Sequence, residues 1–152
     1  RSRCEMPRTT ALRRQHDSLT ALAADISRAA KALAGAGNPE PLEQLLRQFD
    51  TVLTAHLASE DRMLYPEMLG SGDARAAGIA SRFCEEMGGL KNSYAKFAAR
   101  WDSSAARLAD PAGFRRDWAA IEGALSFRIQ RENAELYPLA DALSDASERD
   151  AG

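Results

Sequence analysis

Two stretches of the chain repeat the same pattern of polar and apolar side chains. Both contain the segment Glu-x3-Leu-Tyr-Pro, which begins at Glu60 in the first copy and at Glu132 in the second. The first copy carries His56 four residues before its glutamate, and the second carries Arg128 at the equivalent position. Side chains four residues apart lie on one face of a helix, which is the spacing by which a histidine and a carboxylate share a metal ion. The first copy therefore predicts a pair of metal ligands, whereas arginine has no lone pair to offer.

Apolar residues at helical spacing predict the elements that position these side chains. They indicate four helices, over about residues 10–34, 39–69, 74–101 and 111–143. Asn38, Asp73 and Asp110 precede three of them as N-caps, and Pro66 is expected to bend or end the second helix. Short connections and no β alternation predict an all-α, antiparallel up-down four-helix bundle. The second and fourth helices then run in the same direction, so the two copies of the repeat lie at the same depth. The pair Gly88-Gly89 predicts a close backbone approach, a kink or a local irregularity in the third helix.

Composition limits the classes of protein to consider. The 152 residues are 45% hydrophobic and 28% charged, which is typical of one globular domain. We place the bundle at residues 9–144, with residues 1–8 as a disordered or non-native leader and residues 145–152 as a flexible tail. A net charge of −2 argues against nucleic acid, and no apolar run is long enough to span a membrane. Cys4 and Cys84 lack a CxxC partner, so we expect free thiols in a cytoplasmic, monomeric protein.

The inward faces of the predicted helices carry five polar residues: His16, His56, Glu60, Arg128 and Glu132. The two histidines are the only ones in the chain. Buried carboxylates are costly unless they are paired or coordinate a cation. Either a metal ion or Arg128 must therefore supply positive charge beside the two glutamates.

This pattern resembles the hemerythrin-like, or HHE cation-binding, family over essentially the whole chain. That family is a four-helix bundle holding two irons, with a His on helix one, His-x3-Glu on helix two, His on helix three, and His-x3-Glu followed by Leu-x-Pro on helix four. The resemblance implies metal ligands with two bridging glutamates, at His16, His56, Glu60 and Glu132.

Two positions depart from the family pattern. Met87 follows Glu85-Glu86 where helix three usually supplies a His, and Arg128 replaces the His of the helix-four motif. In the family, the histidines of helices three and four bind the same iron. The resemblance therefore places both departures on that one iron. A thioether is a poor ligand for a hard iron ion, and a protonated guanidinium cannot ligate. We expect no intact two-metal site, and two alternatives stay open: a mononuclear site for one Fe, Zn or Mn ion, and a metal-free core neutralised by Arg128 and a protonated histidine.

Side chains next to these positions are expected to be structural. We predict that Tyr65 and Tyr137 pack at one end of the bundle rather than donate to a carboxylate. We predict that Cys84 is a small buried hydrophobe rather than a thiolate ligand or redox thiol. Three methionines at helical spacing are expected to fill the core: Met63, Met68 and Met87.

Three classes of function are compatible with this pattern. We favour a non-enzymatic regulatory, sensing or binding module that keeps the scaffold and docks a protein partner. The first alternative is an iron protein that handles O2, NO or peroxide. The second is a mononuclear metal hydrolase, which needs an open coordination position and a base. No catalytic residue is assigned.

Overall fold

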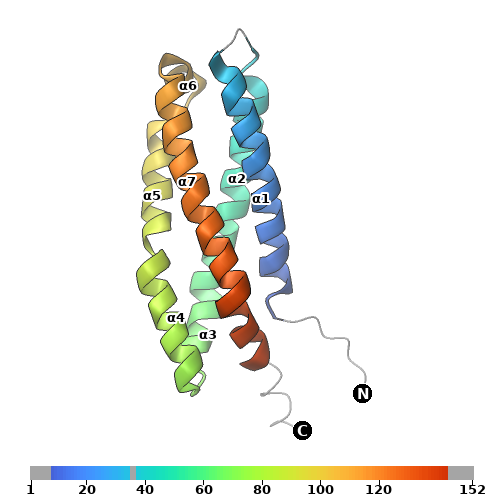
Figure 1. Ribbon diagram of the computed structural model, residues 1–152, viewed down its shortest axis with the longest axis vertical. Helices are drawn as coiled ribbons and strands as arrows, with labels where there is room; N and C mark the ends of the chain where they lie inside the picture. The colour runs from blue at the N-terminus through green and yellow to red at the C-terminus, as the bar shows by residue number, and fades with distance from the viewer. Residues whose placement is uncertain (1–7, 35–36, 144–152) are drawn as a thin grey trace.

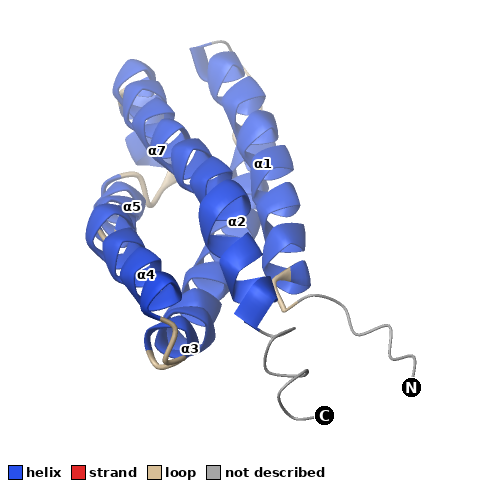
Figure 2. Ribbon diagram, turned by 60° about the horizontal axis from the view of Figure 1, so that its bottom comes forward, coloured by secondary structure: helices blue, strands red, loops and turns tan. Residues whose placement is uncertain are grey.

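The computed structural model describes residues 8–34 and 37–143, and none of these residues lies in a strand. Within them, four long helical rods run side by side (Figure 1). The first rod is α1 (Thr10–Lys31), and the second is α2 (Glu40–Ser59) continued by α3 (Tyr65–Leu69). The third is α4 (Ala74–Met87) with α5 (Gly89–Arg100), and the fourth begins with α7 (Pro111–Arg131). Figure 2, coloured by secondary structure, likewise shows only helices and loops, so the predicted all-α bundle is confirmed.

The leader predicted for residues 1–8 and the tail predicted for residues 145–152 lie outside the described residues, apart from Arg8. None of the described helices is long and apolar enough to cross a membrane.

Polar residues lie at the starts of three helices. Asp73 and Asp110 each accept a hydrogen bond at 3.0 Å from the backbone N–H three residues later. Asn38 accepts one at 3.0 Å from the N–H of Glu40. These bonds satisfy donors that have no partner inside the helix. Asp73 and Asp110 are confirmed as N-caps, whereas the N-cap position of α2 is Pro39, one residue after the predicted Asn38.

The end of the first predicted helix is a 3-10 turn rather than α-helix, and one connection contains a short helix that was not predicted. A 3-10 turn, η1 (Ala32–Ala34), follows α1, and a short helix, α6 (Ser104–Ala109), joins α5 to α7. In α6 the buried Arg107 donates to the carbonyl of Trp101 at 2.6 Å and forms an ion pair with Glu43 of α2. A six-residue segment held by one arginine has too few turns for a periodic signal, so the sequence did not reveal it.

The core is divided into two apolar clusters with a polar layer between them. The larger cluster includes Trp118, and the smaller includes Phe83. On α1, the buried residue His16 lies between Leu12 of the smaller cluster and Leu19 of the larger one. The apolar clusters therefore exclude water from both sides of the polar layer.

Both copies of the repeated segment form a short π-helix, η2 (Glu60–Leu64) and η3 (Glu132–Leu136). In each copy the N–H of the following tyrosine donates to the glutamate carbonyl five residues earlier. Pro66 and Pro138 come next, and proline lacks an N–H and clashes with the carbonyl four residues before it. The wider π turn accommodates this clash. The helix therefore does not end at either proline, since helix continues in α3 and in residues 137–143.

The third predicted helix is interrupted at Gly88, which separates α4 from α5. The N–H of Gly88 donates to the carbonyl of Cys84 at 3.1 Å, while the carbonyl of Met87 accepts from Nη1 of Arg128 at 3.3 Å. A Cβ on Gly88 would lie 2.9 Å from the Cys84 oxygen, closer than real Cβ contacts. The break thus combines a close backbone approach with a carbonyl that is turned toward Arg128.

Two predictions about buried side chains are wrong. Met63 is 67% exposed, because the π turn widens the helix after Glu60 and moves Met63 out of the apolar stripe. Cys84 is exposed as well, because Phe83 takes the inward position on α4. Met68 and Met87 fill the core as predicted.

We predict that Gly88→Ala destabilises the protein and that Gly89→Ala does not. The added Cβ at position 88 meets a backbone carbonyl that cannot move freely, which should cost about 1–3 kcal/mol. A Cβ at position 89 meets nothing within 4 Å, so the better helix propensity of alanine should add about 0.5–1 kcal/mol. Urea unfolding of both variants measures the difference. Equal stabilisation by the two alanines would contradict the close approach at Gly88.

Candidate metal centre

The residues singled out by the repeat and the helical stripes meet in the polar layer. They come from all four rods: His16 of α1, His56 of α2, Glu60 of η2, Met87 of α4, Arg128 of α7 and Glu132 of η3. The four His and Glu residues are at most 1% exposed, and Arg128 is 5% exposed. Parallel placement of the two repeats brings both glutamates to the same depth, so their charges must be balanced inside the protein.

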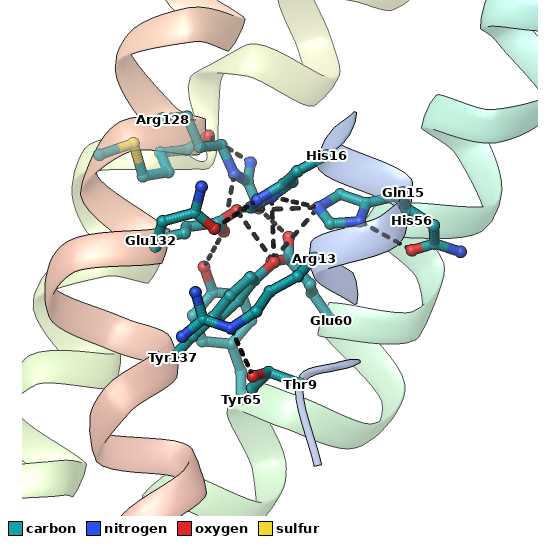
Figure 3. Close-up of polar contacts among 12 residues, drawn as sticks. Thr9, Arg13, Gln15, His16, His56, Glu60, Tyr65, Arg128, Glu132 and Tyr137 are labelled. Carbon is teal, nitrogen blue, oxygen red and sulfur yellow. Dashed lines mark hydrogen bonds and ion pairs between the residues drawn. The ribbon is translucent and has the colours of Figure 1, made fainter. Parts of the chain in front are cut away.

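The two imidazoles face the two glutamates on one side of the layer (Figure 3). Nε2 of His16 lies 3.2 Å from Nε2 of His56 and 2.9 Å from Oε1 of Glu132. Nε2 of His56 lies 3.4 Å from Oε2 of Glu60 and 3.7 Å from Oε1 of Glu132. One donor atom from each of these four residues lies within 4.8 Å of the others. Two nitrogens and two oxygens therefore converge on one point.

Arg128 binds the other side of the same two carboxylates. Its Nη2 donates to Oε1 of Glu60 at 2.7 Å, and its Nε donates to Oε2 of Glu132 at 3.1 Å. Each glutamate thus directs one oxygen to the guanidinium and the other to the imidazoles. Met87 contributes its backbone carbonyl to Arg128, so the contact that it makes in this layer does not involve its thioether.

Both tyrosines of the repeat pack in the smaller apolar cluster, but the prediction that they do not donate to a carboxylate is wrong. The hydroxyl of Tyr137 donates to Oε2 of Glu60 at 2.8 Å and lies 3.1 Å from Nε2 of His16. The hydroxyl of Tyr65 donates to Oε2 of Glu132 at 3.3 Å. Buried tyrosine hydroxyls usually find a polar partner. Their repetition after each buried glutamate was the signal that sequence reasoning undervalued.

Two amide side chains that the sequence did not single out complete the layer. Nδ1–H of His16 donates to Oδ1 of Asn133 at 2.8 Å, and Nδ1–H of His56 donates to Oε1 of Gln15 at 2.8 Å. Each amide is a sequence neighbour of a residue in the donor group. Polar residues beside a helical stripe are common, so no pattern distinguished these two.

Burial and charge shift the pKa values of this cluster in opposite directions. Burial alone would raise the pKa of Glu132, but hydrogen bonds from His16 and His56 and the charge of Arg128 hold it well below its usual range. Burial raises the pKa of Glu60, and the charge of Glu132 adds to that rise. Burial disfavours charged His56, but hydrogen bonds and charges of Glu132 and Glu60 outweigh it and raise the pKa of His56 to about 9. Protonated His56 and Arg128 therefore both supply positive charge to Glu132 and Glu60.

A small cavity of about 100 Å³ reaches Arg128 from the surface beside Gly88. Cys84 lies on its wall, where burial and the charge of Asp61 raise the pKa of the thiol. Among the described residues, Cys84 is not part of the group of donors that could hold a metal. The thiol is thus neither the predicted core residue nor one of the converging donors.

The donor set fits one cation and does not fit two. Two imidazole nitrogens and two carboxylate oxygens are a set that Zn²⁺, Fe²⁺ or Mn²⁺ accepts. The remaining oxygens of Glu60 and Glu132 are already bound by Arg128, whose guanidinium cannot ligate. A second ion beside these oxygens would have to displace the arginine.

Comparison with known families agrees with this geometry. Residues 8–140 match the family described as the hemerythrin HHE cation binding domain. Neither curated proteins nor solved structures gave a match. Because the match covers most of the chain, including both copies of the repeat, this chain belongs to the hemerythrin HHE cation-binding domain family.

Proposed function

We propose that this protein binds a single divalent metal ion through His16, His56, Glu60 and Glu132, and that it acts as a metal-responsive regulatory module. The ion would be Fe²⁺, Zn²⁺ or Mn²⁺, which accept mixed imidazole and carboxylate ligands. Arg128 replaces the second ion. The protein is then not a di-iron oxygen carrier.

The observation that carries the proposal is that each of the two carboxylates contacts Arg128 with one oxygen and the imidazoles with the other. Each has one oxygen on the guanidinium of Arg128 and the other on the imidazole side of the layer. A bridging carboxylate between two metals is shared in the same way. Because the guanidinium of Arg128 occupies one side of the carboxylate pair, only the side that faces the imidazoles is left for a metal ion.

Charge balance supports a site that exchanges a proton for a metal ion. Without metal, protonated His56 and Arg128 are the cations beside Glu60 and Glu132. A divalent cation would displace the proton, since a histidine must be neutral to ligate. Binding would also link the first, second and fourth rods, because the donors come from these three. The expected response to metal is thus a stiffer and more stable bundle.

Burial separates this proposal from the hydrolase alternative. A metal hydrolase needs its substrate at an open coordination position. Here the four donor residues are at most 1% exposed, and apolar clusters lie on both sides. This arrangement favours the binding of an ion and disfavours catalysis on a substrate. The same proposal includes a protein partner that recognises the metal-loaded state. It also includes a cytoplasmic location.

The first test is metal content and its effect on stability. We expect about one Fe, Zn or Mn ion per chain after loading and removal of excess metal. Loading should raise the unfolding midpoint in proportion to the logarithm of free metal, since the ion binds the folded state. Elemental analysis and thermal unfolding provide the two measurements. Two tightly bound irons per chain, with the visible absorption of a coupled di-iron centre, would rule out the proposal.

A second prediction concerns Arg128→His. Removing the guanidinium leaves two buried carboxylates without their partner, so the metal-free variant should lose about 3–5 kcal/mol at pH 8. Added Zn²⁺ or Fe²⁺ should restore more stability in the variant than in the parent, because the new imidazole adds a ligand and frees carboxylate oxygens. Arg116→His on the same helix is the control, because Arg116 is exposed and should change stability by less than about 0.5 kcal/mol. An unchanged metal-free midpoint for Arg128→His would show that Arg128 is not the buried counter-ion.

A third prediction concerns pH. The pKa of His56 is raised in the folded protein from 6.5 to about 9. Its contribution is therefore complete below pH 6.5 and is lost as pH rises through about 9, for a total of up to roughly 3 kcal/mol. Urea unfolding of the metal-free protein across this range should show the decline. His56→Gln should show a flatter profile, and an equally steep decline in that variant would assign the titration to another group.

A further inference from the structure

The Nδ1 atoms of both imidazoles are hydrogen-bonded to amide side chains. Asn133 accepts from Nδ1–H of His16 and Gln15 accepts from Nδ1–H of His56, each at 2.8 Å. Figure 3 shows Gln15 on the side of His56 that faces away from the glutamates. Both amides are only partly buried, so burial alone does not hold them in place.

We propose that Gln15 and Asn133 are positioning residues that set the metal affinity of this site. By accepting from Nδ1–H, each amide fixes the ring orientation and leaves Nε2 to face the other donors. Histidine ligands commonly donate their second ring N–H to an acceptor in this way, and such acceptors tune metal affinity. This inference rests on the proposed single-ion function and names the residues that control it.

The placement of the amides links the three rods that carry the donors. Gln15 precedes His16 on α1 but orients His56 of α2. Asn133 follows Glu132 in η3 but orients His16 of α1. Glu132 and Asn133, adjacent in the π turn, thus contact the two ring nitrogens of the same imidazole. A shift of the first rod would misalign His56, and a shift of the fourth rod would misalign His16.

The neutral charge of the amides has a chemical consequence. A carboxylate acceptor would make the imidazole more basic and would add a third negative charge near Glu60 and Glu132. An amide carbonyl orients the ring without adding that charge. The four donors then neutralise a divalent ion with two carboxylates, and Arg128 remains the counter-ion on the far side.

The inference is tested by paired substitutions at each amide. Asn133→Leu and Gln15→Leu keep the size of the side chain but remove the acceptor, whereas Asn133→Asp and Gln15→Glu keep an acceptor oxygen. Zn²⁺ affinity, measured by competition with a chelator, should fall about 10–100-fold in each leucine variant. It should stay within about 3-fold of the parent, or rise, in the acidic variants, because a carboxylate acceptor raises ligand basicity. The controls are Asn92→Leu and Gln48→Leu, which are exposed positions with the same change of side chain.

A second readout separates positioning from a general loss of structure. In protein with ¹⁵N-labelled histidine, the Nδ1–H proton of His16 should be observed in the metal-free parent and in Asn133→Asp. In Asn133→Leu the signal of this proton should disappear, because the proton exchanges with water or because the ring adopts the tautomer protonated at Nε2. The metal-free unfolding midpoint shows whether each variant is folded, and Gln15→Leu repeats the test at the second imidazole.

The outcomes distinguish this inference from the proposed function. Weaker Zn²⁺ binding in the leucine variants with retention in the acidic variants supports the positioning role. Unchanged Zn²⁺ affinity in both leucine variants, while the parent binds one ion, overturns the positioning role and leaves the proposed function intact. A parent protein that binds no Zn²⁺, Fe²⁺ or Mn²⁺ overturns both.

Discussion

Two fully buried carboxylates, Glu60 and Glu132, set the main physical constraint on this protein. Their negative charges lie where water cannot solvate them, between two apolar clusters. Such a pair is stable only with cations and hydrogen-bond donors around it. Arg128 supplies a permanent cation on one side, and two imidazoles with a proton or a metal ion supply the other.

The backbone irregularities of the bundle occur where this cluster requires them. The π turns begin at the two glutamates, and in each copy the tyrosine that follows the turn donates its hydroxyl to the carboxylate of the opposite copy. The break at Gly88 frees the carbonyl of Met87, which accepts a hydrogen bond from the Nη1 of Arg128. π turns are frequent at functional sites. Here they allow a proline to follow each glutamate while the helix continues beyond it.

Much of the fold and of the polar layer could be predicted from residue types and spacing. Helical periodicity indicated the rods, and the N-caps Asp73 and Asp110 indicated where two of them start. The repeat placed Arg128 opposite a histidine pair, because parallel helices with the same pattern share a depth. The metal-ligand roles of His16, His56, Glu60 and Glu132 remain a prediction.

Other features depend on contacts between elements that spacing does not encode. Periodicity assumed an ideal α-helical register, so it misplaced Met63 after the π turn and left the kind of irregularity at Gly88 undecided. Packing of the tyrosines was predicted, but the carboxylate that each hydroxyl meets belongs to another rod. Gln15 and Asn133 were missed for the same reason, since each bonds a histidine far away in sequence.

The most direct measurement is anomalous diffraction from crystals of the protein loaded with Mn²⁺ or Zn²⁺. We predict one anomalous peak per chain, among Nε2 of His16 and His56 and the facing oxygens of Glu60 and Glu132, with Arg128 still bound to both glutamates. A second peak at the position of the guanidinium, with Arg128 displaced from the polar layer, would contradict the claim that an arginine takes the place of the second metal.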